Sequence, residues 1–254
     1  MKECKKKEKT LSKKSTLPVS HFPFIIVITY VALILGADTL AAYKVSWPFN
    51  WSILHCRLIF LWQFLDQSPP DWAKSVLLNR LDLFKLLFWF ILPFLISLRT
   101  MKWSWFSPHK WKRNDWLFLG GLLVMESIAI LSIKFIPTLH ASYPGLSYLP
   151  VETRLTYSIV SLVWVLSWLP GWEFLHRYFL LHSALKHFPR YGWLLIPLSE
   201  TLYHLQKDPI EAGGMALFSV LLTWWSVKRH NMLLPFLAHL YVEIALIVAL
   251  AFYL

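Results

Sequence analysis

The chain has 254 residues, of which 57% are hydrophobic and only 15% are charged. Soluble domains are roughly 45–50% apolar and about 25% charged, so this composition excludes an ordinary soluble domain and is typical of a membrane protein. The net charge of +11 does not indicate a nucleic-acid partner, because the basic residues lie in an N-terminal tail and in loops between apolar runs, where they orient a protein in the bilayer. Two cysteines supply neither a disulfide framework nor the spacing of metal ligands.

The apolar runs predict an all-α, polytopic protein. We expect a basic, disordered tail (1–20), an N-terminal transmembrane region (21–154) and a C-terminal core (155–254). Seven membrane-spanning helices are predicted, over residues 22–43, 81–98, 116–136, 155–189, 191–206, 211–227 and 232–254. Residues 51–65 are expected to form an interfacial helix, and Lys85 is expected to snorkel towards the membrane surface. The fourth span is expected to kink at Pro170, and residues 171–190 alternatively form an eighth membrane element.

The distribution of basic residues predicts the orientation of these helices. With the seven spans above, the tail, the loop 99–113, the region 186–190 and residues 228–229 all fall on one side of the membrane. Loops enriched in Lys and Arg remain in the cytoplasm. We therefore expect an integral protein of the cytoplasmic membrane, with the N-terminus in the cytoplasm and the C-terminus outside.

Three consecutive predicted helices carry polar pairs four residues apart, a spacing that places two side chains on one helix face. The pairs are Glu173 with Arg177, Glu200 with His204, and His239 with Glu243. A buried charge at membrane depth is costly and is rarely present without a role. A single buried histidine is more often a core residue, and an ion pair can simply lock two helices together. Because three helices in succession share the pattern, we expect these residues to form one polar site.

The residue types limit the chemistry of such a site. A carboxylate in a low-dielectric environment can activate a water molecule as a general base. Imidazoles can bind a metal ion or stabilise the oxyanion of a tetrahedral intermediate. The chain has no nucleophile elbow, no His-Glu-x-x-His helix and no Gly-rich phosphate loop.

Three segments of the C-terminal half resemble the motifs of the CPBP (Abi) intramembrane proteases, a family that includes the CAAX prenyl endopeptidases. They are GWEFLHRYFL (171–180), YHLQKDPIE (203–211) and AH (238–239). The family motifs are Glu-Glu-x-x-x-Arg, Phe-x-x-x-His, and His-x-x-x-Asn or Asp, on separate membrane helices. The resemblance covers residues 155–254 and implies catalytic roles for Glu173, Arg177, His204, His239 and Glu243. In the mechanism it implies, Glu173 is positioned by Arg177 and activates a water molecule. His204 and His239, the latter oriented by Glu243, bind a metal ion or stabilise the oxyanion. The resemblance also implies an endopeptidase that cleaves a membrane-embedded or lipidated protein.

The chain departs from the family at three motif positions. Trp172 replaces the first glutamate of the first motif, Glu200 stands where phenylalanine is usual, and Glu243 replaces asparagine or aspartate. The cofactor stays open: His204 and His239 would be the ligands of a divalent metal such as zinc, if one is used. Two alternatives also stay open, a catalytically inactive immunity or regulatory protein on the same scaffold and a proton-coupled transporter.

Overall fold

The computed structural model describes residues 23–55, 68 and 75–254, and these residues form helices and no strand. Six stretches are long and apolar enough to cross a membrane, so the predicted all-α, polytopic membrane class is confirmed. The basic tail and most of the predicted interfacial helix lie outside the described residues. Only the beginning of that predicted helix, Trp51–His55 (η1), is described, as a 3-10 helix.

The six stretches of spanning length are built from the following elements. The first is α2 (Phe24–Ala42), and the second joins α4 (Leu83–Lys85), η4 (Leu86–Ile91), α5 (Leu92–Ser97) and η5 (Leu98–Thr100). The third joins α6 (Arg113–Ser132) and η8 (Ile133–Phe135), and the fourth joins α8 (Val151–Phe174), η9 (Leu175–Leu180) and α9 (Leu181–His187). The last two are α11 (Pro209–Arg229) and α12 (Leu233–Phe252), and the short helix α7 (Pro137–Ser142) precedes α8. Residues 171–187 thus continue the fourth span through Pro170 and are not a separate membrane element.

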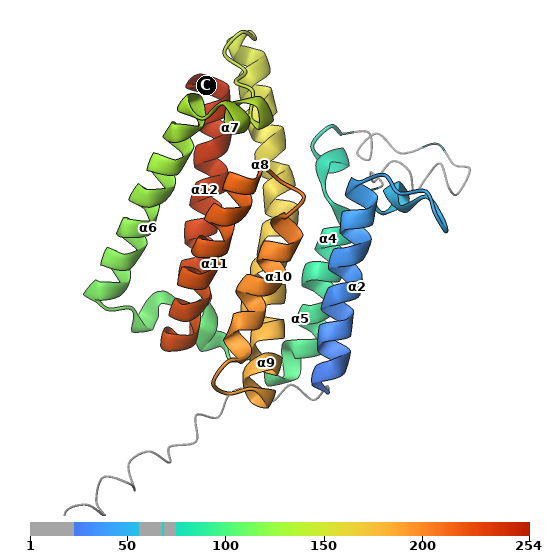
Figure 1. The fold of residues 1–254 in the computed structure, drawn as a ribbon, viewed down its shortest axis with the longest axis vertical. Coiled ribbons are helices and arrows are strands. Elements are labelled where there is room, and N and C mark those ends of the chain that lie inside the picture. Colours follow the sequence, from blue (N-terminus) through green and yellow to red (C-terminus); the bar gives the residue numbers. More distant parts are fainter. Residues whose placement is uncertain (1–22, 56–67, 69–74) are drawn as a thin grey trace, which may run out of the picture.

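One predicted span is too short to cross a bilayer. Residues 191–206 contain a 3-10 turn, Gly192–Leu194 (η10), and the ten-residue helix α10, Leu195–His204. At 1.5 Å per residue α10 is about 15 Å long, half of the roughly 30 Å hydrocarbon core. It runs antiparallel to α11 and packs along it (Figure 1). The prediction of a seventh full span is therefore corrected to a half-length helix.

The turn between α11 and α12 is defined by the backbone conformation of His230 and by a side-chain cap from Asn231. His230 ends α11 in the left-handed region, with a φ of 49°. The side chain of Asn231 then accepts hydrogen bonds from the backbone amides of Leu233 and Leu234, at 3.0 and 3.3 Å. These bonds satisfy amides at the start of α12 that have no partner within the helix.

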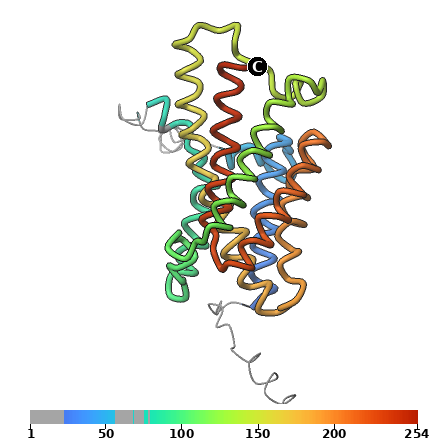
Figure 2. Tube along the Cα trace, turned by 90° about the vertical axis from the view of Figure 1, so that its left-hand side faces the viewer, coloured from blue at the N-terminus to red at the C-terminus, as the bar shows by residue number. Residues whose placement is uncertain are grey.

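The basic segments of the described chain gather at one end of the bundle. Residues 99–113, 186–190 and 228–229 all lie there, and the C-terminus lies at the opposite end (Figures 1 and 2). We call these three segments the basic end. This arrangement has the geometry that the loop charges predict, whereas the compartment that the basic end faces stays a prediction.

The fourth span is the central helix. Its C-terminal half, which leads to the basic end, is the most buried stretch of the described chain. Residues 171–185 are all buried, whereas many residues between 151 and 164 are exposed. Trp172, Phe174 and Leu175 pack in the largest apolar cluster, together with Trp89 of η4 and Val31 of α2. The charged residues of the first motif therefore lie at the centre of the molecule.

Candidate functional site

Glu173 and Arg177 form a buried ion pair on the central helix. The Arg177 Nη1 atom donates a hydrogen bond of 2.7 Å to Glu173 Oε2. The spacing of four residues places them one turn apart, and their side chains are 0% and 1% exposed. The π-helical turn η9 contains Arg177. Such turns, which carry one extra residue, are frequent at functional sites.

A second carboxylate, from α10, completes the coordination of this arginine. Arg177 Nη1 and Nη2 donate to Glu200 Oε1 and Oε2, at 3.0 and 2.9 Å, in the bidentate geometry that guanidinium groups favour. The hydroxyl of Ser219, on α11, donates a further hydrogen bond to Glu200 Oε2. Arg177 therefore lies between two carboxylates from different helices, and Glu200 belongs to the site.

His239 joins the site from α12. Its Nδ1 atom lies 2.7 Å from Glu173 Oε1. Its other ring nitrogen, Nε2, lies 3.9 Å from Glu243 Oε1. The Glu243 side chain is 21% exposed, whereas that of Glu173 is fully buried. The site is thus closed around Glu173 and Arg177 and opens on the Glu243 side of His239.

A second group of polar side chains, Glu211 with Tyr143 and Lys207, is more exposed than the buried cluster. The Tyr143 hydroxyl donates to Glu211 Oε2 at 2.7 Å, and Lys207 Nζ lies 3.9 Å from Glu211 Oε1. Burial, and next the charge of Glu211, raise the pKa of the Tyr143 phenol above its ordinary value. Tyr143 therefore stays a hydrogen-bond donor at physiological pH and holds the segment before α8 against α11.

His204 is placed differently from the other predicted site residues. Its Nδ1 atom lies 2.8 Å from the backbone carbonyl of Glu200, so the predicted Glu200–His204 pair does not form between side chains. Its ring instead lies near Trp172, with 5.7 Å between ring centroids. Within the described chain His204 has no hydrogen bond or ion pair with Glu173 or His239. Of the six residues expected in one polar site, the structure thus joins five by hydrogen bonds or ion pairs and leaves His204 beside them.

Trp172 occupies the side of the central helix that faces α10. It is 1% exposed, and its ring centroid lies 5.0 Å from that of Tyr203 and 4.2 Å from that of His176. An indole therefore lies between the first motif and His204, where the resemblance places a carboxylate. Trp172 thus packs beside His204, and no hydrogen bond or ion pair joins His204 to Glu173 among the described residues.

The described residues do not fit a metal centre. They contain no group of three or more His, Cys, Asp or Glu side chains that could hold a metal ion. His204 and His239 each use Nδ1 in a hydrogen bond, and both oxygens of Glu173 are already paired. Structural and catalytic zinc sites use at least three protein ligands. The structure therefore gives no support to the predicted metal ligands His204 and His239.

A second buried polar cluster links the first span to α10. Asp38 is 1% exposed; it accepts hydrogen bonds from the Tyr203 hydroxyl and, at 3.0 Å, pairs with His55 Nε2. Lys85 Nζ lies 3.6 Å from Asp38 Oδ2 and also 3.6 Å from an oxygen of Asp82. Lys85 is therefore buried in an ion-pair cluster and does not snorkel to the surface, which corrects the expectation from the sequence.

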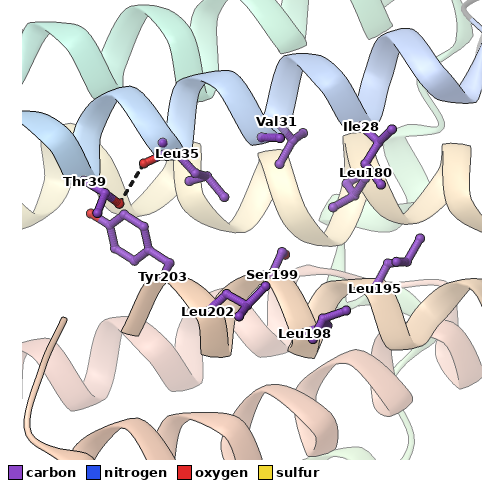
Figure 3. Close-up of a pocket in the computed structure, with 12 residues that line it drawn as sticks. Ile28, Val31, Leu35, Thr39, Leu180, Leu195, Leu198, Ser199, Leu202 and Tyr203 are labelled. Atoms are coloured by element: carbon purple, nitrogen blue, oxygen red, sulfur yellow. Dashed lines mark hydrogen bonds between the residues drawn. The ribbon is translucent and has the colours of Figure 1, made fainter. Parts of the chain in front are cut away.

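An apolar groove opens between α2 and α10 beside this cluster. It has a volume of about 330 Å³ and is lined by aliphatic side chains such as Val31, Leu35 and Leu198. Figure 3 shows Tyr203 at one end of the groove, on the same side as Thr39. Since Tyr203 also contacts Trp172, the groove leads towards the α10 side of the site.

Ser219 is the residue whose place in the site sequence reasoning did not predict. Glu200 was expected in the polar site, but its side chain pairs with Arg177 and not with His204. Ser219 carries no sequence signal, because serine is common in membrane helices. No protein-family model, curated protein or solved structure matches the chain. Fold and site together define an all-α integral membrane protein with a buried Glu–Arg–Glu cluster and a carboxylate-bound histidine.

Proposed function

We propose that the protein is an intramembrane endopeptidase of the CPBP type, which hydrolyses a peptide bond of a membrane-embedded or lipidated protein. The observation that carries this proposal is the 2.7 Å contact between Glu173 Oε1 and His239 Nδ1. It pairs a carboxylate with an imidazole across two helices, at positions that resemble the first and third motifs of that family. A buried carboxylate–histidine pair is a recurrent device for activating a nucleophile.

The geometry favours His239, and not Glu173, as the base. Both oxygens of Glu173 are engaged, by Arg177 and by His239, and its side chain is fully buried. A carboxylate that accepts from Nδ1–H holds the ring in the tautomer whose Nε2 carries the lone pair. That nitrogen lies on the Glu243 side, where the site opens.

The reaction then follows from these positions. His239 Nε2 takes a proton from a water molecule as the water oxygen attacks the scissile carbonyl carbon, and the carbonyl oxygen becomes an oxyanion. Glu173 stabilises the resulting imidazolium ion. When the C–N bond breaks, the same imidazolium returns the proton to the leaving amine, so charge and protons balance. Arg177 keeps Glu173 ionised and fixed, and Glu200 in turn orients Arg177.

His204 is assigned a conditional role in this scheme. Its Nδ1 atom donates to the Glu200 carbonyl, which leaves Nε2 of the neutral ring as an acceptor. A neutral His204 therefore cannot donate a hydrogen bond to an oxyanion, whereas a protonated one can. We expect its contribution to transition-state stabilisation to grow as the pH is lowered.

The groove between α2 and α10 supports a substrate that arrives from the bilayer. Its lining is apolar, and Leu198 and Leu202 at its edge are 54% and 59% exposed. Exposed aliphatic residues of a membrane helix face lipid, so the groove is accessible to hydrocarbon. For orientation we propose that the basic end faces the cytoplasm, which places the N-terminus there and the protein in the cytoplasmic membrane.

The test compares peptides released from membranes that contain the wild-type protein or one of three variants. In Glu173→Gln and His239→Ala we expect the loss of cleavage products that wild type generates. Glu152→Gln changes an exposed acid in the first turn of α8 and should cleave as wild type does. If both site variants release the same products as wild type, the peptidase proposal is wrong.

Trp172 favours a second candidate, a non-catalytic regulator on the same scaffold. Its ring fills the position of the family's first glutamate and separates the first motif from His204. A regulator would need the shape of the bundle and not the base. In that case a strain that lacks the protein would be complemented equally well by wild type and by His239→Ala, and no membrane peptide would change.

A further inference from the structure

Two hydroxyl groups on α11 are buried without a hydrogen bond. Thr223 Oγ1 and Ser226 Oγ belong to residues that are 0% exposed, and neither has a partner in the described part of the chain. Several hydroxyls elsewhere in the bundle satisfy themselves on their own helix, whereas Ser183 Oγ, on α9, is a third buried hydroxyl without a partner among the described residues. Thr39, Ser127 and Ser158 each donate to the carbonyl four residues earlier, at 2.9, 2.7 and 2.9 Å. A buried hydroxyl of this kind is a position at which an ordered water molecule can supply the missing hydrogen bond.

Thr223 and Ser226 share one face of α11 with Ser219, the hydroxyl that contacts the site. Ser219, Thr223 and Ser226 are spaced by four and three residues, which aligns them along one side of a helix. Ser219 donates to Glu200, so this face is directed towards the buried cluster. From Ser219 to Arg229, at the end of α11, the helix rises about 15 Å, which is half the hydrocarbon thickness of a bilayer. The face thus runs along α11 from the Glu200 carboxylate towards the basic end, where α11 ends (Figure 1).

A neighbouring face of the same helix has the opposite character. Leu222 and Phe218 pack in an apolar cluster with Leu119 and Leu122 of α6. Leu222 is one residue from Thr223 and equally buried, at 0% exposure. The two positions are therefore equally buried, and of the two only Leu222 belongs to this apolar cluster.

We propose that a file of ordered water follows the Ser219–Thr223–Ser226 face and connects the Glu200 carboxylate with the basic end. Each hydroxyl offers one donor and two acceptor positions, which suits water molecules that form about three hydrogen bonds when buried. The file gives the buried Glu200 a route for exchanging protons with the solution at that end. It does not depend on peptidase activity, because a transporter or a regulator with the same structure would contain it too.

Cysteine accessibility tests the file. The starting protein carries Cys4→Ser and Cys56→Ser, and Thr223→Cys, Ser226→Cys or Leu222→Cys is then added singly. Ag⁺, which is small enough to follow a single file of water, is applied in chloride-free buffer to either side of sealed proteoliposomes. Thiols that remain free are counted with a maleimide after denaturation in SDS. Lys228→Cys, at the exposed end of α11, reports which side is the basic end.

We expect Thr223→Cys and Ser226→Cys to react at least about tenfold faster than Leu222→Cys, because a thiol in dry apolar surroundings seldom ionises to the reactive thiolate. Both should react from the side at which Lys228→Cys reacts. Adding Ser226→Leu to the Thr223→Cys protein should slow its reaction about tenfold by blocking the file. A single symmetric peak in size-exclusion chromatography and full thiol titration in SDS establish that each variant is folded and intact.

Two results would overturn the proposal. One is a Thr223→Cys or Ser226→Cys thiol that reacts as slowly as the Leu222→Cys thiol. The other is reaction of these thiols only from the side opposite to Lys228→Cys. Neither result bears on the cleavage assay of Glu173→Gln and His239→Ala, so the file and the peptidase proposal fail independently.

Discussion

Arg177 is the residue whose removal tests the electrostatics of the buried cluster most directly. It lies between Glu173 and Glu200, it makes three hydrogen bonds of 2.7 to 3.0 Å, and all three side chains are at most 1% exposed. Arg177→Met keeps an unbranched side chain but removes the guanidinium group, and so leaves two carboxylates without their counter-charge. Breaking a buried ion pair in this way costs about 3–5 kcal/mol. The free energy of unfolding of a protein is typically about 5–15 kcal/mol, so this loss is a large share of the total stability.

The triple variant Arg177→Met, Glu173→Gln and Glu200→Gln separates charge from packing. It has no charge in the cluster, and neutral replacements of a complete buried ion pair are often tolerated. We therefore expect its free energy of unfolding to lie within about 1–2 kcal/mol of wild type, well above that of the single variant. A single substitution that is worse than the triple one is the signature of an uncompensated buried charge.

The measurement is reversible unfolding by SDS in mixed micelles, followed by tryptophan fluorescence. Arg113→Met is the matched control, because Arg113 is exposed at the start of α6 and its loss should change stability by no more than about 0.5 kcal/mol. The reasoning is refuted if Arg177→Met unfolds at the same SDS fraction as Arg113→Met. It is also refuted if the triple variant is no more stable than the single one.

Three further predictions use the same unfolding assay. Asp38→Asn replaces a buried carboxylate that accepts from a tyrosine hydroxyl and pairs with a histidine, so a loss of about 1–3 kcal/mol is expected, and an unchanged midpoint would contradict the role of this cluster. Gly192→Ala would place a Cβ atom 2.4 Å from the Ala184 carbonyl oxygen and should destabilise by at least about 1–3 kcal/mol, whereas Gly121→Ala, with no atom within 4 Å, should be neutral or slightly stabilising. Burial and then nearby lysines lower the pKa of His230 from 6.5, so the unfolded state binds more protons just below that pH and stability should fall as the pH decreases from about 7. His230→Asn, which tolerates the φ of 49°, should flatten this dependence, and an identical slope in both proteins would count against it.

The sequence by itself determined the features that depend on composition and on spacing within one helix. Apolar runs of spanning length predicted the membrane helices, because any backbone that crosses a bilayer must satisfy its own hydrogen bonds. The four-residue spacing of Glu173 and Arg177 predicted neighbours on one face, and these two side chains are in contact. His239 and Glu243 follow the same rule, at a longer distance of 3.9 Å.

Only the tertiary structure decided which helices meet and in which direction each side chain points. Glu200 and His204 share a face of α10, yet the packing of α10 on the central helix directs the Glu200 carboxylate to Arg177, while the His204 ring bonds to the backbone. Lys85 pairs with Asp38, and Ser219 reaches Glu200, through contacts between residues far apart in the chain. Spacing along a helix sets neighbours on that helix, because the helical repeat is constant. Partners on other helices depend on the crossing and depth of the packed elements, which side-chain packing over the whole bundle determines.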